Sequence, residues 1–250
     1  MSFDFSGKSV LVTGATRGIG LGLTRALVKY GGTVYALGSN KELLDALIEE
    51  YGDRVISVHV NLVDWGATRA ALEQLPPMNG LVNNAGVSYA WVPSLDAPKD
   101  IIDKTLSVNL MAQINVTQVI GKKMVEAGNG GSIVNVSSIN GIKPMRECMA
   151  YNLSKAALDM MTKQFALELG PNKIRVNSVN PTVALTDMGK EFWSHPPEKG
   201  AKLKDHTPLG RFAEVEEVVQ PILYLLSDYS SMVTGTINPI EGGLLSNISV

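Results

Sequence analysis

The chain carries at residues 9–20 the stretch Ser9-Val10-Leu11-Val12-Thr13-Gly14-Ala15-Thr16-Arg17-Gly18-Ile19-Gly20. A short run of apolar, β-branched residues leads there into a glycine-rich turn, and a stretch with helical spacing of apolar residues begins at Ile19. Gly14 permits a tight turn, Gly18 has no side chain to hold a phosphate away, and Gly20 lets the helix pack closely on the strand. The N–H groups at the start of such a helix attract a pyrophosphate. The stretch therefore predicts a dinucleotide site, and the absence of a following Gly-Lys-Ser/Thr argues against a nucleotide triphosphatase loop.

The alternation of a short apolar run with a helical pattern continues along the chain. The runs are rich in β-branched residues with little polar alternation, which is typical of parallel strands covered by helices on both faces. Such units build right-handed crossovers, so the sequence predicts an α/β fold: a Rossmann-type doubly wound parallel sheet with helices on both faces. The expected strands are 9–13, 33–37, 54–60, 80–83, 132–136, 174–179 and 234–240, and the expected helices include 19–30, 41–51, 101–127, 150–169 and 215–227.

No feature of the sequence marks a domain boundary. There is no internal repeat, low-complexity tract or Ser/Gly linker, so we expect a single dinucleotide-binding and catalytic domain over residues 1–250. Residues 185–209 depart from the pattern because they contain His195-Pro196-Pro197 and show little periodicity. A loop of that length in a compact domain is usually a lid or a binding loop. We predict a substrate loop or lid at about 185–209, and the alternative is a surface insertion.

Composition argues against several classes of function. The 250 residues have a formal net charge of −2, with 45% hydrophobic and 18% charged residues, which is typical of a folded globule without nucleic acid as its partner. No apolar run approaches the roughly 18 residues of a membrane helix, and the start MSFDFSGK lacks the apolar region of a secretory signal. The single cysteine, Cys148, fits a reducing compartment, so we expect a cytoplasmic protein. The three histidines are scattered, and we expect no metal site.

Several motifs resemble those of the short-chain dehydrogenase/reductase family, and the resemblance spans essentially the whole chain. It implies an oxidoreductase that uses a nicotinamide dinucleotide on CH–OH and C=O groups, and a homotetramer built through the helices that contain Asn109 and Tyr151. The motifs are the G-x-x-x-G-x-G spacing of residues 14–20, Asn83-Asn84-Ala85-Gly86 after the fourth expected strand, Asn109, Ser138 followed by Tyr151-Asn152-Leu153-Ser154-Lys155, and Pro181 with Thr186.

Tyr151 and Lys155 are four residues apart on an expected helix, so their side chains leave the same face. An ammonium about 4 Å from a phenol, at an effective dielectric near 20, is worth about 4 kcal/mol, or about 3 pKa units. We therefore expect Lys155 to lower the pKa of Tyr151. The resemblance implies that Tyr151 is the general acid, that Ser138 donates a hydrogen bond to the substrate oxygen, that Lys155 holds the nicotinamide ribose, and that Asn109 fixes a relay water. The alternatives are a tyrosine that packs on the sheet and, for Ser138, a turn or N-cap serine.

The end of the second expected strand bears on the choice of cofactor. Ser39 and Asn40 follow it without the carboxylate that binds a ribose 2′-hydroxyl, so nothing there repels a 2′-phosphate. Arg17 resembles the basic residue of NADP-preferring family members, and we expect NADP(H), with Lys41 as an additional charge. Asn61 stands where the family usually has aspartate. The expected cofactor-binding residues are Gly14, Thr16, Arg17, Gly18, Ile19, Gly20, Ser39, Asn40, Asn61, Leu62, Asn83, Ala85, Gly86, Tyr151, Lys155, Pro181, Ala184, Thr186 and Met188.

Substrate contacts are expected from residues 139–150 and from the loop at 185–209. Within the family, several stretches are similar to reductases of small α-dicarbonyls and of L-xylulose, which is converted to xylitol, although Cys148 stands where those enzymes tend to have histidine. The alternatives are a family member that acts on another ketone or secondary alcohol, and a catalytically silent nucleotide-binding module. The expected substrate-binding residues are Ser138, Ile139, Met145, Cys148, Tyr151 and Trp193.

Overall fold

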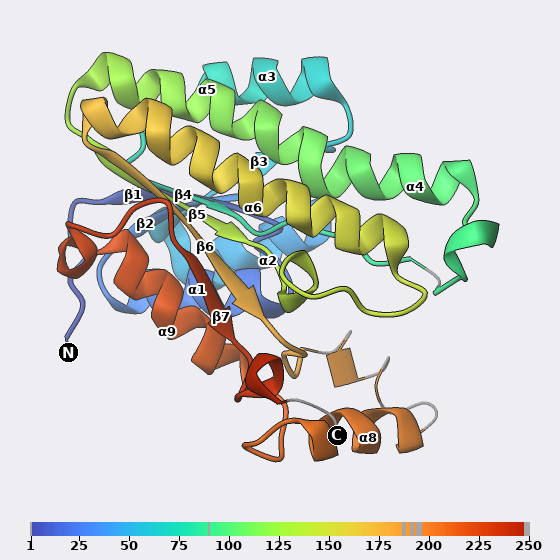
Figure 1. Ribbon diagram of the computed structural model, residues 1–250. Helices are drawn as coiled ribbons and strands as arrows, with labels where there is room; N and C mark the ends of the chain where they lie inside the picture. Colours follow the sequence, from blue (N-terminus) through green and yellow to red (C-terminus); the bar gives the residue numbers. More distant parts are fainter. Residues whose placement is uncertain (1, 90, 187–188, 191–192, 194–196, 248–250) are drawn as a thin grey trace.

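The computed structural model describes residues 2–89, 91–186, 189–190, 193 and 197–247 (Figure 1). A parallel sheet with strand order β3-β2-β1-β4-β5-β6-β7 forms its centre. The predicted doubly wound α/β fold is therefore confirmed. The strands are β1 (Ser9–Thr13), β2 (Thr33–Gly38), β3 (Val55–His59), β4 (Gly80–Asn83), β5 (Gly131–Val136), β6 (Ile174–Pro181) and β7 (Ile237–Ile240).

Helices cover both faces of the sheet (Figure 1). One layer holds α1 (Gly18–Lys29), α2 (Lys41–Tyr51) and α9 (Val215–Leu226), and the other holds α3 (Trp65–Glu73), α4 (Lys99–Leu106), α5 (Ala112–Ala127) and α6 (Met149–Leu169). Helix α8 (Pro197–His206) lies beside the sheet rather than on it. Short helical turns are η1 (Gly52–Arg54), η2 (Ser94–Asp96), η3 (Ser107–Met111), η4 (Ile139–Gly141), η5 (Gly170–Asn172), η6 (Asp228–Ser230) and η7 (Leu244–Ser246).

Each face of the sheet buries its own apolar cluster. Val10 and Val12 of β1 join Leu23 of α1 and Ile222 of α9 in one cluster, whereas Leu11 belongs to the cluster that contains α5. Successive side chains of a strand point to opposite faces, so a strand that is covered on both sides is apolar at every position. This arrangement explains why the runs of the sequence show little polar alternation.

Three elements differ from the sequence-based expectation. The expected helix 101–127 is α4 and α5 joined through η3, a turn of π-helix. Helix α3, which Asp64 caps through its side chain, was not singled out by the sequence. The range 185–209 is not a loop throughout, because α8 occupies much of it. Helix α8 has Glu198 in its first turn and basic residues in its last turn, which suits the helix dipole, but few apolar residues to give a periodic signal.

The topology also defines where a ligand site is expected. The sheet runs outward in opposite directions from the neighbouring strands β1 and β4. The crevice outside the carboxyl ends of the strands at such a switch point is the usual ligand site of an open α/β sheet. Among the described residues, the helices include none with the length and hydropathy needed to cross a membrane.

Candidate active site

The glycine turn between β1 and α1 has the backbone that the sequence suggests. Gly14 and Gly18 have φ angles of +64° and +52°, in the region that favours glycine. A Cβ on Gly20 would lie 2.1 Å from the carbonyl oxygen of Gly14, so no larger residue fits there. Arg17 at the start of α1 makes no side-chain cap, and the first turn of α1 contains no acidic residue. The free N–H groups and the positive end of α1 therefore suit a pyrophosphate.

The turn is tied to the end of β4 by two residues that the sequence-based site did not include. The hydroxyl of Thr13 accepts hydrogen bonds from the backbone N–H groups of Asn84 and Ala85, at 2.9 and 3.0 Å. The Asn84 amide in turn donates to the carbonyl oxygens of Thr13 and Gly14. These bonds fix Ala85 beside the turn. In the sequence, the Asn83-Asn84 pair indicates such a contact, but the expected cofactor-binding residues include only Asn83 of the two.

Asn83 has a different position from Asn84. Its side chain is buried, and its amide donates to Thr117 and Asn135 on the neighbouring α5 and β5, both at 2.8 Å. The structure does not bring this side chain to the crevice. The buried Asn83 side chain therefore links β4 to β5 and to α5.

The end of β2 lies next to the turn. A Cβ on Gly38 would be 3.6 Å from the methyl group of Thr16, and Ser39 and Asn40 follow Gly38 with exposed side chains. The Asn40 side-chain oxygen accepts a bond from the Leu43 N–H and caps α2, which leaves its amide protons for a ligand. Lys41 forms an exposed ion pair with Asp45.

Other expected cofactor residues lie around the same crevice. Leu62 is buried, whereas Asn61 is exposed and its side-chain oxygen accepts the Val63 N–H at 3.2 Å. Ile19 is half-buried in the first turn of α1.

Residues after β6 close over the glycine turn. A Cβ on Gly18 would lie 2.9 Å from the methyl group of Thr186, so Thr186 is directly above the place where a phosphate would enter. Pro181 ends β6, and Ala184 forms a bridge with Ala213 that holds this segment. Met188 lies outside the residues that the structure describes. Gly18 and Thr186 thus lie in close contact, and a side chain at residue 18 would displace Thr186.

The proposed catalytic side chains come from β5, η4 and α6. Ser138 precedes η4, and Tyr151 and Lys155 occupy successive turns of α6. The Ser138 hydroxyl lies close enough to the Tyr151 phenol to lower its pKa. The Lys155 ammonium donates to the Val136 carbonyl at 2.9 Å and lies 5.6 Å from the centre of the Tyr151 ring. The structure therefore brings Ser138, Tyr151 and Lys155 together.

The pKa of Tyr151 shifts in the opposite direction from the one expected. Burial raises it above its ordinary value and outweighs the hydrogen bond from Ser138, which lowers it. Burial also lowers the pKa of Lys155 to about 8, while the charge of Asp159 raises it in part. The expectation that Lys155 depresses the pKa of Tyr151 is therefore wrong in this structure. The reason is that both groups are desolvated, and the ammonium is directed to the Val136 carbonyl.

Asn109 occupies the π-helical turn η3, a type of irregularity that often marks a functional site. Its side-chain oxygen accepts the Val87 N–H at 2.8 Å, and its amide donates to the Val87 carbonyl and to Ser154. Asn109 is fully buried and joins η3 to α6 and to the segment after β4. A Cβ on Gly86 would lie 3.4 Å from its oxygen and 3.6 Å from the Lys155 nitrogen, so Asn109 and Lys155 face one space.

Asp159 is a buried acid that the sequence-based site missed. It lies one helical turn beyond Lys155, and its carboxylate accepts two bonds from the Asn180 amide, at 2.9 and 3.1 Å. Asn180 also donates to the Ser138 carbonyl, so the network links Asp159 to Ser138. Burial raises the pKa of Asp159, and hydrogen bonds from Ser137 and Asn180 oppose that shift. Tyr151, Lys155 and Asp159 follow one another at a spacing of four residues, which in the sequence indicates that they share one face of the helix.

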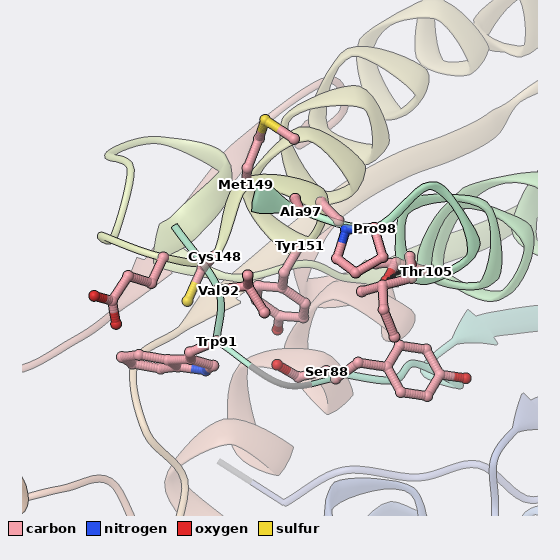
Figure 2. A pocket seen from close by; sticks show the side chains of 13 residues that line it. Ser88, Trp91, Val92, Ala97, Pro98, Thr105, Cys148, Met149 and Tyr151 are labelled. Atoms are coloured by element: carbon pink, nitrogen blue, oxygen red, sulfur yellow. Dashed lines mark hydrogen bonds between the residues drawn. The ribbon is translucent and has the colours of Figure 1, made fainter. Parts of the chain in front are cut away.

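A cavity of about 20 Å³ lies beside Tyr151, with room for about one water molecule. Figure 2 shows Cys148 and Trp91 on one side of Tyr151 and Thr105 on the other. Its walls come from residues 88–105 and from the start of α6. Two of the expected substrate residues, Cys148 and Tyr151, line this cavity. Ile139 and Met145 are not among its described lining residues.

Trp193 reaches the same wall from the range 185–209. Its ring makes an edge-to-face contact with Trp91, with the ring centres 5.6 Å apart, and lies 6.0 Å from Phe212. Trp193 therefore packs against a residue that lines the cavity. Among the described residues, no group of three or more His, Cys, Asp or Glu side chains is arranged to hold a metal ion.

The fold and this constellation define a nicotinamide-dependent oxidoreductase. A family model described as enoyl-(acyl carrier protein) reductase matches residues 14–245. The chain belongs to the short-chain dehydrogenase/reductase family. It is 46% identical to L-xylulose reductase of Bos taurus over 98% of this chain and 100% of that one. It is 44% identical to carbonyl reductase [NADPH] 2 of Sus scrofa over 99% of this chain and 100% of that one.

A solved structure supports the fold assignment. The gluconate 5-dehydrogenase of Burkholderia cenocepacia, in complex with NADP and tartrate, superimposes with a TM-score of 0.92 at 26% identity, covering 99% of this chain and 98% of that chain. The protein is thus an oxidoreductase of CH–OH and C=O groups whose cofactor is NAD(P).

Proposed function

We propose that this protein catalyses the NADPH-dependent reduction of small carbonyl compounds, α-dicarbonyls and L-xylulose among them. The observation that carries the proposal is the convergence of Ser138, Tyr151 and Lys155 near the carboxyl end of β5. Of these three residues, Tyr151 also lines the small cavity described above. The names of the L-xylulose and carbonyl reductases that the chain resembles support the substrate class.

The roles of the residues follow from their contacts. With a dinucleotide bound over the glycine turn, the nicotinamide ring supplies the hydride. Tyr151 donates the proton to the substrate carbonyl oxygen, and its raised pKa keeps the phenol protonated near neutral pH, as a general acid requires. Ser138 donates a hydrogen bond to the same oxygen, where negative charge develops. Lys155 holds the nicotinamide ribose, and Asn109 holds a water that returns protons through Lys155.

The preference for NADP(H) rests on charge. Arg17 is exposed at the start of α1 and makes no side-chain cap, so its guanidinium is available for a 2′-phosphate. Ser39 and Asn40 add hydrogen-bond donors without a carboxylate that would repel it.

We further propose a cytoplasmic homotetramer. Exposed apolar side chains on the outer face of α6 support an interface there, namely Leu153, Met160 and Leu167. The single cysteine supports a reducing compartment.

The test is absorbance of NADPH with butane-2,3-dione and with L-xylulose, for the wild type and Tyr151→Phe. We expect turnover by the wild type and a loss of at least 100-fold in the variant, because general acid catalysis typically contributes 10²–10⁴-fold. Unchanged circular dichroism verifies that the variant folds. Full turnover by Tyr151→Phe would refute the assignment, and an inactive wild type that still binds NADPH would favour the silent module.

A further inference from the structure

The backbone of Ser138 is held by a buried side chain that the sequence-based site does not contain. Asn180, near the end of β6, donates from its amide nitrogen to the Ser138 carbonyl oxygen at 2.9 Å. The backbone N–H of Gly141 donates to the same oxygen at 3.0 Å. Asn180 is fully buried, and Ser138 is buried as well. Hydrogen bonds that are shielded from water in this way fix the start of η4 in one position.

The partners of Asn180 determine how its amide group is oriented. The Asp159 carboxylate and the Ser138 carbonyl only accept hydrogen bonds, so the nitrogen end of the amide faces both of them. The Ser178 hydroxyl donates to the opposite, oxygen end at 2.7 Å. Every polar atom of the Asn180 side chain is therefore engaged, and Asp159 anchors it from α6.

The turn η4 also lies directly on Asp159. A Cβ on Gly141 would clash with a carboxylate oxygen of Asp159 and would lie 2.9 Å from the carbonyl oxygen of Lys155. Asp159 thus supports the segment that begins at Ser138 in two ways, by direct contact and through Asn180.

The hydroxyl of Ser138 is oriented by the same short segment. Its oxygen accepts the Asn140 N–H at 3.2 Å and caps η4. A serine hydroxyl has a single proton, which this contact does not use. The hydroxyl lies beside the Tyr151 phenol, so a carbonyl oxygen that meets Tyr151 also meets the proton of Ser138. Such a donor stabilises developing charge best when its position is fixed before the reaction begins.

We propose that Asn180, anchored by Asp159, is a positioning residue: it holds the Ser138 hydroxyl where the substrate oxygen gains negative charge. Asn180 acts through the backbone of Ser138 and is not itself a catalytic residue. The inference rests on the proposed function, because the role of Ser138 is part of that proposal.

A double-mutant cycle tests whether Asn180 acts through Ser138. The variants are Asn180→Ala, Ser138→Ala and the two combined, and kcat and KM are measured with NADPH and butane-2,3-dione. Asn115→Ala is the matched control, since Asn115 is equally buried and bonds Trp65 and Arg69, which both belong to α3. Its replacement removes buried hydrogen bonds without changing a contact of Ser138.

We expect Asn180→Ala to lower kcat about 10-fold or more, because a displaced donor stabilises the developing charge less. KM for NADPH should change less than about 2-fold, since Asn180 acts on the substrate side. In the Ser138→Ala background the same substitution should lower kcat less than about 2-fold, because no hydroxyl is left to position. Asn115→Ala should keep kcat within about 2-fold at a comparable loss of unfolding free energy in urea.

Equal losses of kcat from Asn180→Ala with and without the Ser138 hydroxyl would overturn the inference, and so would an equal loss in Asn115→Ala. If Asn180→Ala does not fold, Ser178→Ala replaces it in the cycle, because it removes only the bond to the Asn180 oxygen. The expected loss of kcat is then about 3-fold, and it should again vanish in the Ser138→Ala background.

A crystal structure of the Asn180 or Ser178 variant tests the placement without turnover. The distance from the Asn140 nitrogen to the Ser138 hydroxyl oxygen is 3.2 Å in the intact chain. It should lengthen beyond about 3.5 Å, where a hydrogen bond is lost. An unmoved hydroxyl would overturn the inference. A wild type that oxidises no NADPH would instead contradict the proposed function, and it would leave the structural comparison valid.

Discussion

Asn109 and Lys155 face each other across Gly86: a Cβ at residue 86 would lie 3.4 Å from the Asn109 oxygen and 3.6 Å from the Lys155 nitrogen. These distances are ordinary van der Waals contacts, and the φ of Gly86 is not among the positive values. An alanine therefore fits the backbone but occupies the space between the two polar groups. A water that joins Asn109 to Lys155 would lose that space.

We accordingly predict that Gly86→Ala lowers kcat about 10-fold or more, because the proton relay through Lys155 is interrupted. The free energy of unfolding, measured by urea denaturation, should change by less than about 1 kcal/mol, since no clash arises. Gly121→Ala serves as the control, because a Cβ there would meet only Leu169, at 3.6 Å. Equal kcat in both variants would show that no proton relay runs through the space between Asn109 and Lys155.

Asp159 provides a test through pH. Its buried carboxylate raises the pKa of Lys155, which burial lowers to about 8. Lys155 is charged below its pKa, so activity that needs the ammonium falls as the pH rises through that value. Asp159→Asn keeps a hydrogen-bond acceptor for Asn180 but removes the negative charge, and the pKa of Lys155 should fall further.

In Asp159→Asn, kcat/KM should therefore begin to fall at a lower pH on the alkaline side. The apparent pKa of this fall should decrease by about half a unit or more. The exposed pair of Lys122 with Glu126 on α5 offers a control, since Glu126→Gln alters a surface ion pair whose residues do not line the cavity beside Tyr151. A uniform loss of activity with an unshifted profile would indicate that Asp159 acts only through packing.

Burial of Lys155 predicts a cost in stability. A pKa lowered from 10.5 to about 8 corresponds to a cost on the order of 3 kcal/mol for the charged form, at about 1.4 kcal/mol per unit. Lys155→Met removes that cost but leaves the Val136 carbonyl without its donor, which costs about 1–2 kcal/mol. We expect a net gain of about 1–2 kcal/mol at pH 7 together with loss of activity.

The gain should shrink between pH 8 and 10.5, since the wild-type lysine there loses its charge in the folded state first. Urea denaturation at pH 7 and at pH 10 measures the difference. Lys163→Met, an exposed lysine of the same helix, should show no such dependence on pH. A destabilised Lys155→Met at pH 7 would contradict the argument.

Arg17 provides the test of cofactor preference. Because its guanidinium is the charge available for a 2′-phosphate, Arg17→Ala should raise KM for NADPH about 10-fold or more and leave KM for NADH within about 2-fold. Arg25→Ala on the same helix is the matched control, since Arg25 pairs with Glu50 at the surface. Equal effects on both cofactors would exclude Arg17 as the source of the preference.

Local features of the sequence predicted which of the candidate site residues lie near one another. The glycine turn is a contiguous motif between a strand and a helix, and Tyr151 and Lys155 belong to one helix, so their proximity follows from helical spacing. Asp159 continues that spacing and could have been found in the same way.

Two expectations failed for different physical reasons. Helix α8 has few apolar residues and so gave no periodic signal. The pKa of Tyr151 was expected to fall because only Lys155 was considered, whereas the burial that raises it comes from the surrounding fold.

The order of the amino acids alone therefore sufficed to assign the α/β fold and the family and to place Tyr151 and Lys155 on one helix, because these depend on periodicity and short-range spacing. The direction of the pKa shifts and the walls of the cavity beside Tyr151 depended on the folded chain. Desolvation and long-range contacts exist only once β5, α6 and residues 88–105 are brought together.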